Sequence, residues 1–247
     1  MNRLMKAEWY RARKSSGVIK WLFFITIAVL AIPFLDDMPE GKATASSYIF
    51  AFNEQACVFI PMFFSALAGA FVGIPFTNKT AMYEVMAGNQ ISRILNSKLF
   101  VIVPLISLTV TCFFSMMLGV LGIMNGSGSL DNIPLRILLL FIILLHITMV
   151  GVLAVTTTRH AVGIVLAFLR FGMLEGIAVT WLSILFEDAS ETTLQKVGGW
   201  FVTNQVYATA YDKIPDYMFV EAILGLVIEV VFWYILSYIG YKKKKFA

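Results

Sequence analysis

The sequence predicts an all-α membrane protein with six transmembrane helices in a single domain. Of its 247 residues, 59% are hydrophobic and 14% are charged, whereas a soluble domain is about 45–50% apolar and about 25% charged. Six apolar stretches reach the length of about 20 residues that a helix needs to cross a bilayer. Basic residues flank alternate connections between these stretches. Water therefore cannot be the main solvent of this chain.

Nearly all of the length is used by spans and short connections, so we expect one transmembrane domain over residues 1–247. An amino-terminal elbow helix is predicted over residues 1–17, and a basic tail over residues 241–247. The predicted transmembrane helices are 18–35, 56–76, 99–124, 135–155, 161–186 and 218–240.

The distribution of charge predicts the orientation of these spans, because cytoplasmic connections carry an excess of lysine and arginine. One set of connections is basic and contains Arg3, Lys6, Arg11, Arg13, Lys14, Lys20, Lys79, Arg93, Lys98, Arg159 and Lys242 to Lys245. The opposite set is acidic and contains Asp36, Asp37, Glu40, Asp131, Glu187, Asp188, Glu191, Asp212 and Asp216. Both termini are therefore predicted to be cytoplasmic. The net charge of +4 lies beside hydrophobic spans, so no nucleic-acid partner is expected.

The amino-terminal segment has the pattern of an amphipathic helix. Leu4, Met5 and Trp9 stand among basic residues, and such a helix can lie in the cytoplasmic interface of the membrane. The alternative is that the basic residues serve only as a topology signal.

The cytoplasmic stretch 78–98 also has a helical pattern. Apolar residues recur at helical spacing, namely Met82, Val85 and Met86, then Ile91, Ile94 and Leu95. We predict a short interfacial helix, a break at Gly88-Asn89 and a second helix that is capped near Ser92. A solvated hairpin that merely connects two spans is the alternative.

The segment 187–217 is too long for a simple turn between helices. Leu194, Val197 and Phe201 share one helical face, and Trp200 adjoins them. We therefore predict a re-entrant or interfacial segment before the last span, with a bend at Gly198-Gly199.

Four ionisable residues form a predicted polar network inside the spans. Counted at about 1.5 Å per residue from the cytoplasmic ends, Arg170 and Glu229 both lie at a depth of roughly 14–16 Å. His146 falls at a similar depth, and Glu175 lies about 7–8 Å further out than Arg170. Matched depth predicts an Arg170–Glu229 ion pair. The network either fixes helix register as a static pair or lies beside a substrate pathway.

The second span contains the small-residue pattern Gly69-x-x-x-Gly73, with Ala66 and Ala70 nearby. Such a surface allows two helices to approach closely. It marks either a homodimer contact or packing within one subunit.

Two segments carry a resemblance to a known family. They are AEWYRARKSS near the amino terminus and YEVMAGNQISRILNSK in the cytoplasmic stretch, with Ser92-Arg93 and Lys98 in the expected order. With six spans and a long excursion before the last one, the chain resembles the membrane subunit of a type-two ABC exporter, in the group of bacteriocin-immunity and peptide-export permeases. The resemblance implies a bacterial plasma membrane protein.

The resemblance also implies the partners of the chain. Two permease subunits would pair with two cytoplasmic ATPase subunits, and Tyr83, Glu84, Ser92 and Arg93 would form the coupling contact with the ATPase. The chain lacks a G-x-x-x-x-G-K-[ST] loop, since Gly41-Lys42 has no upstream glycine. We therefore expect no cofactor in this chain, with ATP and Mg²⁺ bound by the partner.

Three classes of function remain after these observations. The leading hypothesis is an exporter of hydrophobic or amphipathic peptides, such as lantibiotics or small toxins, by the resemblance; lipids and drugs are alternative substrates. A membrane sensor or assembly subunit that transports nothing is the second class. An intramembrane enzyme is disfavoured, because the chain has two histidines, one of them at the cytoplasmic edge, and no paired carboxylate motif.

Overall fold

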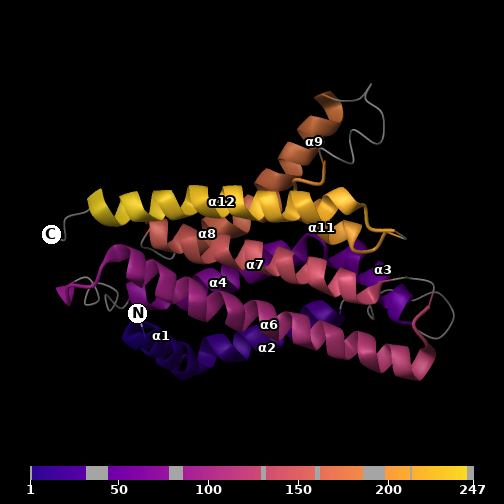
Figure 1. Cartoon of the computed structure of the whole chain (residues 1–247), viewed down its shortest axis with the longest axis horizontal. Helices are drawn as coiled ribbons and strands as arrows, with labels where there is room; N and C mark the ends of the chain where they lie inside the picture. Colours follow the sequence, from indigo (N-terminus) through magenta and orange to yellow (C-terminus); the bar gives the residue numbers. More distant parts are fainter. Residues whose placement is uncertain are drawn as a thin grey trace.

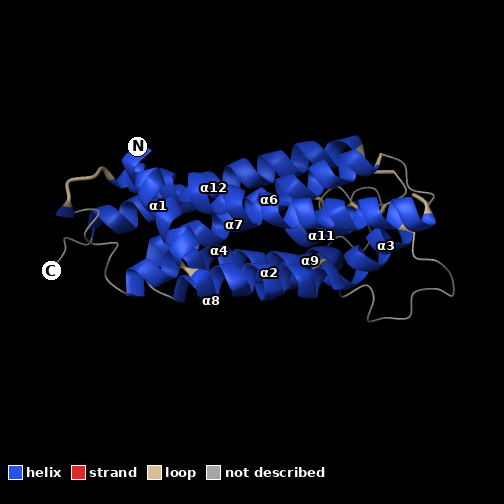
Figure 2. Ribbon diagram, turned by 90° about the horizontal axis from the view of Figure 1, so that it is seen from below, coloured by secondary structure: helices blue, strands red, loops and turns tan. Residues whose placement is uncertain are grey.

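The computed structural model describes residues 2–31, 44–77, 86–128, 132–158, 162–185, 198–211 and 213–243. Every regular element within these residues is a helix, which confirms the all-α prediction for them. The long helices run roughly parallel along the longest axis of the molecule (Figure 1 and Figure 2). In chain order they are α1 (Asn2–Lys14), α2 (Ser16–Ala31), α3 (Ala45–Ala56), α4 (Phe59–Thr77), α6 (Ile91–Asn125), α7 (Ile133–Thr158), α8 (Val162–Leu169), the π-helix η2 (Arg170–Leu174), α9 (Glu175–Leu185), α11 (Val202–Ala208) and α12 (Asp216–Lys243).

Several of these helices are suited to a membrane. By length and composition, four described segments can cross one, namely α6, α7, the run from α8 to α9, and α12. A fifth arises if α1 and α2, which meet at a bend of 70°, form one broken span. The apolar part of α4, Phe59–Gly73, is shorter. The transmembrane helical character predicted from the sequence is confirmed at this level.

Helix α7 lies at the centre of the bundle, where it contacts α4, α6, α8 and α12. It is apolar on every face, and a helix of that kind is surrounded on every face. Its residues Ile143, Leu144, Ile147 and Val150 are fully buried. By contrast, α12 exposes apolar side chains that include Val227, Ile228, Val231 and Phe232. Those exposed side chains are compatible with a lipid environment or with a second membrane subunit.

Helix α3 was missed by the span prediction, which left its residues in a short connection. Its start is a capping box: the Ser47 amide donates to the Thr44 hydroxyl at 3.2 Å, and the Thr44 amide donates to the Ser47 hydroxyl at 2.9 Å. Tyr48 and Phe52 are buried on the bundle side of the helix. The Tyr48 hydroxyl donates to the carbonyl of Leu30 at 2.8 Å, which ties α3 to the end of α2.

The predicted cytoplasmic helices differ from the structure at their boundary. The break at Gly88-Asn89 is present, and Gly88 adopts a φ of +77° that favours glycine. The helix after the break begins at Ile91, and its N-cap is Gln90, two residues before Ser92, near which the cap was predicted. It then continues without interruption through the predicted start of the third span, because no glycine and no proline stands between residue 91 and Pro104. The first predicted helix of this stretch lies mostly outside the described residues.

A helix forms where the amino-terminal elbow was predicted, and it packs against α6. Glu8 is buried on the side that faces α6, and its carboxylate lies 2.6 Å from the ammonium of Lys98, whose side chain is fully buried. Arg11 lies 3.1 Å from the same carboxylate at the surface. The sequence placed Lys98 among the basic flanks of a span, whereas in the structure it anchors α1.

The small-residue surface of α4 packs inside the subunit, against α7 and α8. A Cβ atom on Gly69 would lie 2.9 Å from a methyl group of Val155, and one on Gly73 would touch the same pair of helices. On the facing side of α7, a Cβ on Gly151 would overlap the backbone carbonyl of Ser65. Of the two alternatives for the Gly69-x-x-x-Gly73 pattern, the structure has the packing within one subunit.

We expect Gly151→Ala to destabilise the folded protein by about 1–3 kcal/mol, because backbone of α4 would have to move away. Gly122→Ala is the matched control, since Gly122 is also helical and a Cβ there meets no atom within 4 Å. The control is expected to be neutral or to gain up to about 1 kcal/mol. Thermal unfolding in one detergent measures both. Equal stability of the two variants would show that the close approach of α4 and α7 is unimportant.

Candidate functional site

The four predicted intramembrane residues meet in one cluster. His146 comes from α7, Arg170 and Glu175 come from the two ends of the π-turn, and Glu229 comes from α12. Helix α7 contacts both α8 and α12, and α12 runs along one side of the bundle (Figure 1). The His146 and Glu175 side chains are almost completely buried, and the Arg170 and Glu229 side chains keep 27% and 16% of their surface exposed.

Glu229 is the centre of this charge cluster. The Arg170 guanidinium donates two hydrogen bonds to its carboxylate, from Nε to Oε1 at 2.9 Å and from Nη2 to Oε2 at 3.1 Å. This is the two-pronged geometry that makes arginine–carboxylate pairs strong. His146 Nε2 lies 3.0 Å from Oε2, and the Trp233 indole donates to Oε1 at 3.4 Å. The pair that matched depth predicts is thus formed, and the histidine joins it.

The π-turn brings Arg170 and Glu175 together. In an α-helix, two residues five apart point about 140° away from each other. Here the Glu175 amide donates to the Arg170 carbonyl and closes the wider turn of a π-helix, which places the two side chains near one another. Arg170 Nη1 then reaches Glu175 Oε2 at 3.3 Å. A single arginine therefore compensates two carboxylates.

The second oxygen of Glu175 holds the segment before α12. The Thr203 amide, in the first turn of α11, donates to Glu175 Oε1 at 2.6 Å. That amide is one of the donors that a helix start leaves without an intrahelical partner. The cluster therefore connects four segments of the chain, which are α7, the π-turn, α11 and α12.

The residues around α11 fold back onto the bundle, as far as the structure describes them. Val202 and Val206 are buried, and α11 contacts α7, α12 and α3. A turn follows the predicted bend at Gly198-Gly199, and the side-chain amide nitrogen Nε2 of Gln205 donates to the Gly199 carbonyl at 2.9 Å. Phe201 is the N-cap of α11. Leu194 and Val197, which were predicted to share its face, lie outside the described residues.

Arg136 is a buried cation that the sequence prediction missed. Its Nη1 donates to the carbonyl of Thr209 at 2.6 Å and to that of Tyr211 at 2.7 Å, just after α11. These contacts fasten the end of α11 to α7. The signal was available in the sequence, since Arg136 stands inside the predicted span 135–155, where a charged residue is costly.

The charge balance of the cluster indicates what it can do. One guanidinium contacts the carboxyl groups of both Glu229 and Glu175, and one imidazole contacts Glu229. His146 Nδ1 is buried and has no hydrogen-bond partner within the described chain. In the described residues, no three His, Cys, Asp or Glu side chains are grouped so as to hold a metal ion.

The predicted coupling residues are remote from the charge cluster along the helices. Ser92 is half-buried and Arg93 is exposed, both in the first turn of α6. That turn lies at the end of the bundle where α12 also ends (Figure 1). Tyr83 and Glu84 lie outside the described residues.

Comparison with protein-family models and with curated proteins finds no match to this chain.

Proposed function

We propose that the chain is the permease subunit of an ATP-driven exporter, in which a separate ATPase subunit binds ATP and Mg²⁺. The observation that carries the proposal is the charge cluster around Glu229. Charged groups within transmembrane helices are costly, and they mark substrate pathways or polar networks that move. Because this cluster connects four segments, a displacement of any one of them changes hydrogen bonds in the others. That is the property required of a bundle that alternates between two states.

The proposed topology has six passes with both termini in the cytoplasm and α1 in the interface. It adds α2 and α4 to the four longest apolar segments. Support comes from the arrangement of the helix ends. Helix α1, the start of α6 and the end of α12 gather at one end of the bundle, whereas α3 and α11 lie at the other (Figure 1). The basic bias of the sequence assigns the first of these ends to the cytoplasm.

The proposed partners and substrate rest on the family resemblance. Two copies of this chain would pair with two ATPase subunits in a bacterial plasma membrane and export hydrophobic or amphipathic peptides. The exposed apolar face of α12 is compatible with a second copy or with lipid. The exposed position of Arg93 at the first turn of α6 leaves its guanidinium accessible to a cytoplasmic partner.

Arg93→Ala tests the ATPase contact. We expect the variant to insert normally but to lose about tenfold or more in affinity for the ATPase subunit, because removal of one partner from a buried interfacial charge pair costs about 2–5 kcal/mol. Lys213→Ala is the control, since Lys213 is an exposed cation at the opposite end. The measurements are co-purification with the ATPase from native membranes, and ATP hydrolysis by the complex in nanodiscs.

Two outcomes would contradict this proposal at different levels. If no ATPase accompanies the purified protein, the exporter assignment fails, and a sensor or assembly role takes its place. The second outcome is that an ATPase co-purifies, and that its complex with the Arg93→Ala variant assembles and hydrolyses ATP as well as the complex with the control. In that case the exporter assignment stands. The coupling contact then lies in another segment.

A further inference from the structure

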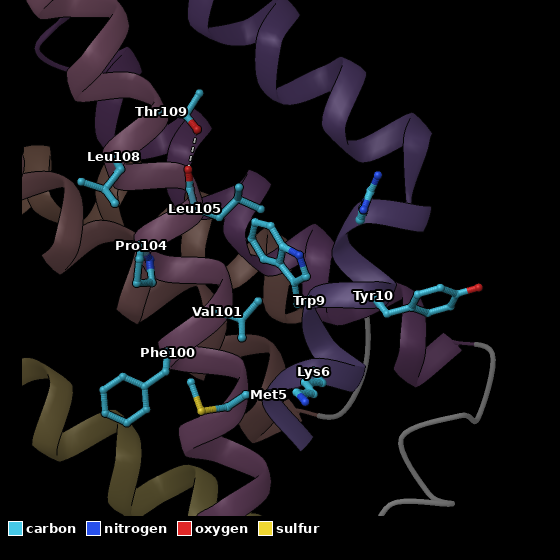
Figure 3. A pocket seen from close by; sticks show the side chains of 11 residues that line it. Met5, Lys6, Trp9, Tyr10, Phe100, Val101, Pro104, Leu105, Leu108 and Thr109 are labelled. Atoms are coloured by element: carbon cyan, nitrogen blue, oxygen red, sulfur yellow. Dashed lines mark hydrogen bonds between the residues drawn. The ribbon is translucent and has the colours of Figure 1, made fainter. Parts of the chain in front are cut away.

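A groove of about 710 Å³ lies between α1 and α6, at some distance from the charge cluster. Lys6, Trp9 and Arg13 line it from α1, and Phe100, Pro104 and Leu108 line it from α6. Figure 3 shows Trp9 directed toward Leu105 and Val101, across the space between the two helices. The volume falls within the range of about 300–1,000 Å³ that is typical of small-molecule sites.

The α1 side of the groove is basic and aromatic. Lys6, Trp9, Tyr10 and Arg13 recur at helical spacing on one face of α1, which is the arrangement of a membrane-surface helix. Trp9 and Tyr10 remain more than half exposed. Tyr10 points outward from the groove in Figure 3. Tryptophan and tyrosine favour the level of lipid headgroups, where a ring meets both apolar and polar surroundings.

The α6 side of the groove is apolar. Phe100, Pro104 and Leu108 present hydrocarbon to it, and Phe100 and Leu108 keep 58% and 51% of their surface exposed. The single hydroxyl there belongs to Thr109, and it donates to the carbonyl of Leu105 at 2.6 Å (Figure 3). This wall therefore offers contact area for an alkyl chain and no unpaired hydroxyl donor.

The two walls are held in a fixed relation. The buried Glu8–Lys98 ion pair joins the same two helices. The carboxylate in this pair belongs to Glu8, the one acidic residue of α1. Among the described residues that line the groove none is acidic, so no carboxylate of this set balances the charges of Lys6 and Arg13.

We infer that the groove binds one anionic phospholipid. An acyl chain lies along Phe100, Pro104 and Leu108, and the phosphate lies at the rim near Lys6 and Arg13. The charge complementarity selects an anionic headgroup, because each lysine or arginine near a membrane surface favours an anionic lipid. The site requires only that α1 lies at a membrane surface, and it does not depend on an ATPase partner or on transport.

Native mass spectrometry of the delipidated full-length protein tests the inference. The probes are phosphatidylglycerol and phosphatidylcholine with identical acyl chains, added separately. We expect phosphatidylglycerol to bind at least tenfold more tightly. Lys6→Gln with Arg13→Gln should weaken that lipid by about 25-fold, at about fivefold for each cation. The control is Lys20→Gln with Lys242→Gln, which removes two exposed cations outside the groove and should change binding by less than threefold.

A second variant separates the groove from the general surface. Leu108→Trp fills the apolar wall without changing the charge, and it is expected to reduce phosphatidylglycerol binding by about tenfold or more. Equal binding of the two lipids would overturn the inference, even if Leu108→Trp abolishes both. Equal losses of phosphatidylglycerol binding in the Lys6/Arg13 variant and in the Lys20/Lys242 control would also overturn the inference, since binding would then follow the net charge of the protein. A change of dimerisation without a change of lipid binding would assign the groove to a second copy instead.

Discussion

Replacement of Arg170 with methionine is expected to destabilise the folded protein by about 3–5 kcal/mol. The reason is the number of carboxylates that this side chain compensates. Its guanidinium donates to both oxygens of Glu229 and to one oxygen of Glu175. Methionine keeps much of the volume of the side chain but leaves two carboxylates facing each other within the bundle. Denaturant or thermal unfolding in one fixed detergent measures the loss.

The Glu229→Gln variant and the double variant complete the cycle. Glu229→Gln leaves the guanidinium without its two-pronged partner, although Glu175 remains. The double variant should recover about 0.5–3 kcal/mol relative to the sum of the single losses, because the two residues interact directly. Recovery is expected to be partial, since Glu175 still lacks its arginine. Lys213→Met, which removes an exposed cation, should stay within about 0.5 kcal/mol of wild type. Strictly additive losses would refute the pair.

Lys98→Met is expected to cost a similar amount, about 3–5 kcal/mol, because it leaves the buried Glu8 carboxylate without its closest cation. The matched control uses the same carboxylate. Arg11 also contacts Glu8, but its side chain is one-third exposed, and surface pairs of this kind contribute about 0–1 kcal/mol. Arg11→Met should therefore be nearly silent. Because both cations contact the same Glu8 carboxylate, the difference in stability between Lys98→Met and Arg11→Met reports on how deeply each cation is buried.

A second measurement for this prediction is the rate at which a protease cuts the junction between α1 and α2. Proteolysis near Ser15, between α1 and α2, should accelerate in Lys98→Met and return toward the wild-type rate in Glu8→Gln with Lys98→Met, because the double variant removes the uncompensated charge. If Lys98→Met and Arg11→Met unfold alike and are cut alike, the ion pair does not hold α1 against α6.

Several features of the site were predictable because they depend on distances along a helix. The rise per residue is nearly constant, so the equal depths of Arg170 and Glu229 follow from the span boundaries alone. His146 was assigned a similar depth, and it contacts the same carboxylate. The fold class follows equally directly, since uninterrupted apolar stretches of this length form helices in a membrane.

Other features depend on tertiary contacts that no local pattern encodes. The five-residue spacing of Arg170 and Glu175 separates them in an α-helix, and only the π-turn brings them together. Glu8 and Lys98 are 90 positions apart, and both look like ordinary flanking charges until α1 docks on α6. Helix α3 is different. Its capping box pairs Thr44 with Ser47 instead of the usual glutamate or glutamine, and the search for spans passed over a helix of 12 residues.

The unusual length of α6 has a mechanical consequence. Its 35 residues extend about 52 Å, whereas the hydrocarbon core of a bilayer is about 30 Å thick. The helix is therefore longer than that core is thick, and Arg93 stands on its first turn. At its far end, the carbonyls of Gly126 and Ser127 accept hydrogen bonds from the amides of Ala45 and Ser46, where α3 begins. A displacement of the first turn would therefore reach α3 along one continuous helix, in which Pro104 leaves one backbone carbonyl without its helical amide donor.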